Sequence, residues 1–261
     1  MIRLQEIVAY LREFAPQELA EDWDNVGLLI GDPADEIHSV LTCLTLTPNV
    51  AEEAIASKCQ LIVTHHPVLF RPVQRLTAET SEGRMLLSLI RAGVSVYSPH
   101  TSYDSAADGI NAQLARRLDL RDVQPLRPRA DSPHGSGRWG RLPASIALRE
   151  LIDCVKPLLR VATLQYVGDL NRPITKLAIA CGAAAEFLRE ASQFGCEALL
   201  TGEARFHSCL EAEASDIALI LPGHYATERP AMEQLAEIMH SRFTTLVVQS
   251  SHSEYDPVKF V

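Results

Sequence analysis

The strongest constraint on the fold is an alternation of short apolar runs with helix-forming runs, which occurs twice along the chain. The clearest echo pairs Cys59–Thr64 with Cys196–Thr201, each an apolar stretch that ends in threonine after an alanine-bearing helical pattern. A second echo pairs Val94–Ser98 with Ile217–Leu221, and each is followed by a proline and then a histidine. Such alternation predicts an α/β fold with mostly parallel strands joined by helices. A repeat of this length indicates duplication of one unit.

A composition shift divides the two halves. Residues 125–143 are rich in proline, glycine and arginine and poor in apolar residues, which is typical of a linker or a long ordered loop. We therefore expect a first α/β domain over residues 1–124 and a second over residues 144–261. Gly135–Gly140 spells G-x-G-x-x-G, but no strand pattern precedes it, so a dinucleotide site is not expected.

Bulk composition limits the partners of the chain. The net charge of −9 argues against general binding to nucleic acid or to anionic membranes. No run approaches the ~18 apolar residues of a membrane span. Met1–Phe14 has the spacing of an amphipathic helix and lacks the apolar block of a signal peptide. The six cysteines include no C-x-x-C pair, which predicts reduced thiols in a cytoplasmic protein.

Two histidines end the first of the echoed strands. The apolar run Leu61–Thr64 leads into His65, His66 and Pro67, and the proline stops the strand. Neighbouring residues on a strand point to opposite sides. Two imidazoles that point to opposite sides of a strand are poorly placed to bind the same metal ion. Each of them can instead bind one ion of a pair. The sequence therefore predicts metal ligands at this strand end.

Similar polar groups follow the last strand of each half. The first half supplies His100 and Asp104, and the second supplies His224 and Glu228, both in a turn between a strand and the next helix. Thr227 is the expected N-cap, which would keep Glu228 ionised in the first helical turn. We expect three or four imidazoles and two carboxylates to gather around two cations where the halves meet. This nitrogen and oxygen donor set suits Zn, Fe, Mn, Co or Ni.

Other chemistries have less support. The sequence contains neither a G-x-S-x-G nucleophile motif nor a Walker phosphate loop. Glu203, Arg205 and His207 cluster after a strand of the second half, where they either contact a substrate or form an ordinary surface turn. An isolated H-x-x-x-E is weak support for a metal site. The convergence of several such groups on strand ends is what favours one.

These motifs, in combination, resemble a known family. The chain is similar to the GTP cyclohydrolase I type 2 homologues, also called the NGG-interacting-factor-three-like dinuclear-metal proteins. The matching stretches run over nearly the whole chain and are Trp23–Gly31, Thr64–Pro67, His100–Asp104, Gly135–Arg138, Thr201–Glu203 and Gly223–Glu228.

The resemblance implies two duplicated three-layer α/β/α domains with mostly parallel or mixed sheets, a metal site between them, and a ring-shaped homohexamer. It implies that His100 is a sixth ligand, a group that supports a ligand, or a general base. The chain departs from the family at Ser102-Tyr103, where Asn-Leu is common, and at Cys181–Ala185, where a glycine-rich turn is common. The implied metal ligands are His65, His66, Asp104, His224 and Glu228, with Glu228 as the bridge.

Three functions follow from this resemblance. The first is a metal-dependent hydrolase that acts on a small molecule by cyclohydrolase-like ring opening or by phosphoester or amide hydrolysis, with two divalent ions as cofactors. The second is storage or delivery of a metal ion without catalysis. The third is a regulatory scaffold whose metals are structural, which would lose its fold or assembly on chelation. The sequence alone does not separate the three.

Overall fold

The computed structural model describes residues 2–129, 132–259 and 261. The described residues form two compact units, and the first combines Met1–Tyr103 with Ala231–Pro257. The second combines Asp104–Pro230 with Val258–Val261. Each unit is a mixed sheet covered by helices, which confirms the α/β class. No helix in the described residues is long and apolar enough to cross a membrane.

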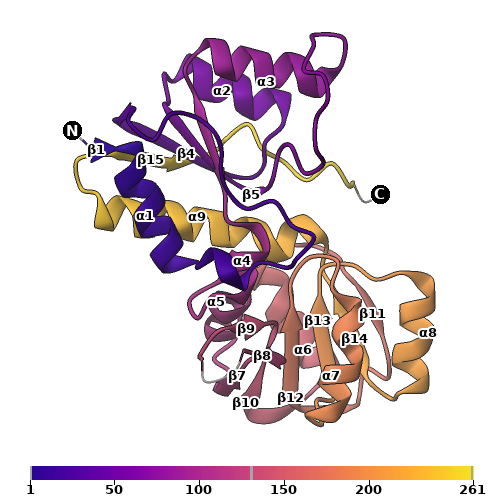
Figure 1. Cartoon of the computed structure of the whole chain (residues 1–261). Helices are drawn as coiled ribbons and strands as arrows, with labels where there is room; N and C mark the ends of the chain where they lie inside the picture. Colours follow the sequence, from indigo (N-terminus) through magenta and orange to yellow (C-terminus); the bar gives the residue numbers. More distant parts are fainter. Residues whose placement is uncertain (1, 130–131, 260) are drawn as a thin grey trace. The chain divides into compact units, whose positions relative to one another are not determined.

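The first unit is built on a five-stranded sheet with the order β15-β4-β5-β6-β2. The first four strands of this order run parallel, and β2 pairs antiparallel with β6. Figure 1 shows α2 and α3 over one face of the sheet, with α1 and α9 over the other. The elements are β1 Ile2–Arg3, α1 Leu4–Phe14, η1 Gln17–Leu19, β2 Gly27–Ile30, β3 Glu36–Ile37, β4 Ser39–Thr45, α2 Pro48–Ala56, β5 Leu61–His66, α3 Ser81–Arg91, β6 Ser95–Ser98 and β15 Val247–Ser250.

Side chains along each strand point alternately to the two faces of the first sheet. Leu41, Ile62 and Val96 belong to one buried cluster with the apolar side chains of α2 and α3. Both helices begin at threonine N-caps, because Thr47 accepts a hydrogen bond from the Val50 N–H and Thr80 accepts one from the Gly83 N–H. These caps fix the helix starts beside the carboxyl ends of β4 and β5.

The second unit is built on a six-stranded sheet with the order β11-β14-β13-β12-β10-β7. Strands β12, β13 and β14 run parallel, and β11, β10 and β7 are antiparallel to their neighbours. Its elements are α5 Ile110–Arg117, β7 Arg121–Gln124, β8 Arg127–Pro128, β9 Gly135–Ser136, β10 Arg138–Ala147, α6 Leu148–Leu158, β11 Gln165–Val167, β12 Pro173–Ala180, η2 Ala185–Phe187, α7 Leu188–Gln193, β13 Ala198–Thr201, α8 Phe206–Ala214 and β14 Ala218–Leu221. Two further helices, α4 His100–Ser105 and α9 His224–Arg242, have residues in both units.

The predicted repeat is confirmed by strand order. The strand order β2-β6-β5-β4 in the first sheet matches the order β11-β14-β13-β12 in the second sheet, with the same parallel and antiparallel pairings. In the second unit, Leu177, Ile179 and Leu200 face α5 and α6, whereas Ala178 and Leu199 lie in the cluster with α7 and α8. Each unit therefore has the three layers expected of a duplicated α/β/α fold.

Residues 125–143 differ from the linker or loop that their composition indicates. They contain β8, β9 and the first part of β10, a ten-residue strand inside the second sheet. Arg138 explains this order, because its guanidinium is buried and donates to the backbone oxygens of Gly135, Gly137 and Ala106. The domain ranges 1–124 and 144–261 stay predictions. Strand β15, which lies in the second of these ranges, pairs with β4 of the first unit.

The region after β6 also differs from expectation. The sequence favours a single helix over residues 105–118 with a turn before it. Instead, His100 begins the short helix α4, and α5 begins after Gly109, which makes no side-chain cap. His100 therefore starts a helix, with a φ of +29°. A non-glycine residue in this left-handed region costs on the order of 1–3 kcal/mol, and surrounding contacts must hold it there.

Candidate metal centre

Three histidines of the first unit converge at the carboxyl ends of its parallel strands. His65 and His66 are the last two residues of β5, and His100 follows β6. Their ring centroids lie 5.2 Å (His65–His66), 5.2 Å (His65–His100) and 5.8 Å (His66–His100) apart. Each offers one ring nitrogen within 4.8 Å of the others, which is close enough for a metal ion. We call this group the three-histidine cluster.

A buried aspartate orients the third histidine. His100 Nδ1 donates to Asp24 Oδ1 at 2.7 Å, and the Asp24 side chain is fully buried. The Thr101 N–H and Oγ1 donate to Asp24 Oδ2 at 3.1 Å and 2.5 Å. Burial raises the pKa of Asp24, but the hydrogen bonds from His100 and Thr101 outweigh it and lower that pKa to about 2. An ionised carboxylate behind a metal-binding imidazole fixes its tautomer and leaves Nε2 for the ion.

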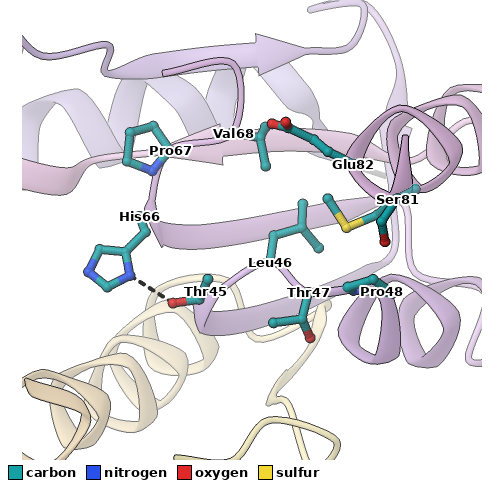
Figure 2. Close-up of a pocket in the computed structure, with 10 residues that line it drawn as sticks. Thr45, Leu46, Thr47, Pro48, His66, Pro67, Val68, Ser81 and Glu82 are labelled. Atoms are coloured by element: carbon teal, nitrogen blue, oxygen red, sulfur yellow. Dashed lines mark hydrogen bonds between the residues drawn. The ribbon is translucent and has the colours of Figure 1, made fainter. Parts of the chain in front are cut away.

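A threonine holds His66 in a similar way. Thr45 Oγ1 lies 2.7 Å from His66 Nδ1. Figure 2 shows this pair at one side of a pocket of about 340 Å³, whose other lining residues come from the start of α2, the start of α3 and the loop after β5. The orientation of His66 therefore depends on the position of Thr45.

Thr45 is fixed in turn by the segment that follows β15. The Glu254 carboxylate accepts hydrogen bonds from the Leu44 N–H at 3.0 Å and the Thr45 N–H at 2.6 Å. Glu53 holds the same segment, because its carboxylate accepts from Ser251 Oγ at 2.5 Å and from the His252 N–H at 2.9 Å. Residues 251–254 thus brace the end of β4 beside the three-histidine cluster.

This bracing gives a testable expectation. Replacing Glu254 by alanine should lower the free energy of unfolding by about 1 kcal/mol, because two backbone N–H groups lose a charged acceptor at a partly exposed site. Urea denaturation of the metal-free protein measures the change. Glu237→Ala, at another position in the first unit, is the control and should leave stability within ~0.5 kcal/mol of the parent. Equal stability of the two variants would contradict the bracing role.

The second unit has a polar cluster of its own at the end of β14. His224 Nε2 lies 3.0 Å from Glu228 Oε2, and His224 Nδ1 lies 2.9 Å from Glu203 Oε1. The hydrogen bond to Glu228 is the main reason that the pKa of His224 rises to about 9, against the opposing effect of burial. The two carboxylates therefore give this place a negative potential, which stabilises a protonated imidazole and would equally stabilise a bound cation. We call these residues the His224 cluster.

A close approach of the backbone shapes this cluster. Gly182 has a φ of +74°, and a Cβ at this position would lie 2.2 Å from Glu228 Oε1 and 3.3 Å from His224 Nε2. Thr227 Oγ1 accepts a hydrogen bond from the Gly182 N–H at 3.1 Å. The prediction of Thr227 as N-cap is wrong, because α9 begins at His224 and Thr227 lies inside its first turns. The hydroxyl of Thr227 instead holds the turn that leaves room for Glu228.

Asp104 lies near the same cluster. The negative charges of Glu228 and Asp104 both act on the thiol of Cys181. Burial, aided by these charges, raises the pKa of Cys181 well above its usual value. In the metal-free chain the thiol is therefore protonated, and the donors ready to bind a cation in this part of the second unit are nitrogen and oxygen atoms. This donor chemistry fits Zn, Fe, Mn, Co or Ni.

The other residues that the sequence singled out, Glu203, Arg205 and His207, lie in different surroundings. Glu203 contacts His224, whereas Arg205 precedes α8 and His207 is exposed on it, beside the ring of Phe206. Sequence reasoning missed Asp24 and Thr45, although each orients a predicted site residue. Asp24 carried one signal, since it lies in a polar turn between apolar segments. Thr45 carried none, because its partner is 21 residues away.

The sequence matches the family described as Duf34/NIF3 (NGG1p interacting factor 3) over residues 2–257. The chain belongs to this family. Among curated relatives of this Duf34/NIF3 protein, one from Clostridium acetobutylicum, named GTP cyclohydrolase 1 type 2 homolog, is 32% identical and is covered over 99% of both chains. Another, the protein NIF3 homolog of Schizosaccharomyces pombe, is 34% identical over 92% of both chains. The resemblance found in the sequence is thus confirmed.

Solved structures of other family members share the fold of this Duf34/NIF3 protein. A hypothetical protein of Staphylococcus aureus superposes with a TM-score of 0.92 at 25% identity and covers 99% of each chain. A Bacillus cereus protein related to NIF3 also gives a TM-score of 0.92, at 19% identity, and this likeness shows the fold alone.

Proposed function

We propose that this Duf34/NIF3 protein is a hydrolase that depends on two divalent metal ions and acts on a small molecule by cyclohydrolase-like, phosphoester or amide hydrolysis. The observation that carries the proposal is the three-histidine cluster, in which a fully buried, ionised Asp24 orients His100. A carboxylate behind an imidazole is the usual support of a catalytic metal ligand or of a general base.

The proposed ligands are those expected from the sequence. His65 and His66 supply ring nitrogens from the first unit, and Asp104, His224 and Glu228 supply donors from the second. When bound in such a site, divalent ions polarise a carbonyl or phosphoryl group and make water acidic enough to attack it near neutral pH. Thr45 keeps His66 Nδ1 engaged, and Asp24 keeps a proton on His100 Nδ1.

We assign His100 the role of general base. Its Nδ1 is committed to Asp24, so Nε2 is the atom that takes a proton from the attacking water. Asp24 stabilises the resulting imidazolium without accepting the proton, because its pKa is held at about 2. The alternative role for His100, that of a sixth ligand, predicts a different metal count in its variant.

Metal analysis and turnover together test the proposal. We expect two ions per chain in the parent, fewer in His65→Ala and Glu228→Ala, and two in His100→Ala with activity reduced at least ~100-fold. Substrates to screen are GTP, phosphoesters and cyclic amides. His38→Ala, which alters an imidazole outside both clusters, should behave as the parent. Equal turnover in the parent and in His65→Ala would exclude metal-dependent hydrolysis.

The same measurements separate the other candidate functions. Transfer of metal to an acceptor without any turnover would favour storage or delivery. Loss of fold or assembly on chelation, again without turnover, would favour a scaffold with structural metals. The homohexamer and the cytoplasmic location expected from the sequence are part of this proposal, and the mass of the assembly in solution tests the first of them.

A further inference from the structure

Two exposed aromatic rings stand beside the three-histidine cluster. Trp23 is 60% exposed and Phe70 is 44% exposed. The Trp23 ring lies 6.1 Å from the His100 ring and 6.0 Å from the Phe70 ring, and Phe70 lies 6.5 Å from His100. All three rings meet at steep angles, between 65° and 88°. The exposed fractions of Trp23 and Phe70 show that aromatic surface is left for a further partner.

Hydrogen bonds hold the backbone that carries both rings. Trp23 precedes Asp24, whose carboxylate accepts from the Asn25 N–H at 2.8 Å in addition to its contacts with His100 and Thr101. The Asn25 side chain donates to the backbone oxygen of Leu69 at 2.9 Å, directly before Phe70. One polar turn thus positions His100 and the two aromatic rings together. Positioning before binding lowers the entropic cost of binding a ligand.

There is room for a ligand against Phe70. A pocket of about 450 Å³, within the usual range for small-molecule sites, is lined by Leu69, Phe70, Arg71, Pro72, Val73 and Glu82. Its walls are mainly apolar, with one guanidinium and one carboxylate. This lining suits a flat ring that carries polar substituents. A long polyanion fits it poorly, because only one of the lining residues is basic.

We propose that Trp23 stacks on a planar heteroaromatic ring of the substrate next to the three-histidine cluster, and that Phe70, whose plane is inclined by 65° to that of Trp23, contacts the edge of the same ring. The inference rests on the proposed function, because it names the substrate class of the same site. Exposed aromatic pairs near polar groups are typical of binding sites. A π-face accepts any flat ring, so the rings select for planarity, and Arg71 and Glu82 contact its polar edge.

The chain has only two tryptophans, which makes a direct test simple. In Trp139→Phe the remaining tryptophan is Trp23, so the fluorescence of the variant reports on binding beside Trp23 and Phe70. Trp139 stacks on Phe194 in the second unit, at 5.0 Å and 18°, where phenylalanine preserves the contact. We expect guanosine to quench the fluorescence of the metal-loaded variant with a saturating curve. Ribose, which lacks the flat ring, should cause no change. Absence of saturation with guanosine overturns the proposal.

Substitutions then locate the binding site. Calorimetry should show guanosine affinity reduced on the order of tenfold in Trp23→Ala, as for loss of one stacked ring, reduced by less in Phe70→Ala, which loses an edge contact, and largely restored in Trp23→Phe. Phe206→Ala is the matched control, because Phe206 is 72% exposed and lies 5.9 Å from the ring of His207, outside both clusters. Affinity unchanged in Trp23→Ala, or reduced equally in Phe206→Ala, overturns the proposal.

Two further readouts keep this test separate from that of the proposed function. Metal content should be equal in the parent and in Trp23→Ala, since the ring supplies no ligand. Binding of guanosine without turnover of any screened substrate would contradict the hydrolase and would leave the binding of a flat ring at Trp23 and Phe70 supported. A changed assembly mass in Trp23→Ala, with no loss of guanosine affinity, would show that the rings cover another copy of the chain and would overturn the inference.

Discussion

Replacing Gly182 by alanine is expected to abolish metal binding at the His224 cluster and to lower the free energy of unfolding by about 2 kcal/mol. The φ of +74° alone costs an alanine roughly 1–2 kcal/mol. The new Cβ would also lie 2.2 Å from Glu228 Oε1, so the carboxylate must leave its position. Glu228 is buried and bonded to His224, which makes this displacement costly. Metal analysis and urea denaturation measure the two effects.

Gly195→Ala is the matched control for this experiment. Gly195 lies in the same unit with a φ of +66°, and the nearest atom to its new Cβ would be Lys176 Nζ at 3.8 Å. This variant should show the backbone strain without a collision and should keep its metal. If both variants lose metal equally, the close approach of Gly182 to Glu228 has no special role.

Replacing Asp24 by asparagine is expected to lower turnover roughly 100-fold while metal content stays at that of the parent, because the variant loses the charge that stabilises the protonated His100 imidazole. It should also lower the stability of the metal-free protein at pH 7 by about 2 kcal/mol. The second value follows from the fall in the pKa of Asp24 from 3.8 to about 2 on folding. Turnover assays with metal analysis, and urea denaturation, give the two measurements.

The stability difference between the parent and Asp24→Asn should depend on pH. Because the pKa of Asp24 is lower in the folded state, its stabilisation is complete above about pH 4 and disappears as the pH falls toward 2. The stability gap between the parent and Asp24→Asn should therefore narrow over that interval. Asp22→Asn, two residues away, is the control and should show no gap. A gap that persists at pH 2 would contradict the role assigned to the Asp24 carboxylate.

The periodic parts of the chain could be predicted from the sequence. Apolar runs ending at Thr64 and Thr201 became β5 with its two histidines and β13, because buried parallel strands need continuous apolar residues. The convergence of His65, His66 and His100 followed from strand order, since neighbouring parallel strands end at the same edge. The local spacing of apolar and polar residues was therefore enough to predict the α/β architecture and the three-histidine cluster.

What the sequence did not reveal depends on contacts between distant residues. Asp24 acts through His100, 76 residues away, and no local pattern couples the two. Strand β10 forms in a proline- and glycine-rich stretch because three backbone oxygens surround the buried Arg138. Thr227 looked like an N-cap by type, but its hydroxyl bonds to the Gly182 turn instead. In each case a tertiary contact outweighed local preference.

Strand β15, at Val247–Ser250, has a consequence for biosynthesis. It pairs with β4, which leaves the ribosome much earlier in translation, so the β4 edge of the first sheet stays unpaired until residues 247–250 have emerged. An open strand rim of this kind invites association with other nascent chains. The newly made chain is therefore expected to be most prone to association in the interval before β15 emerges.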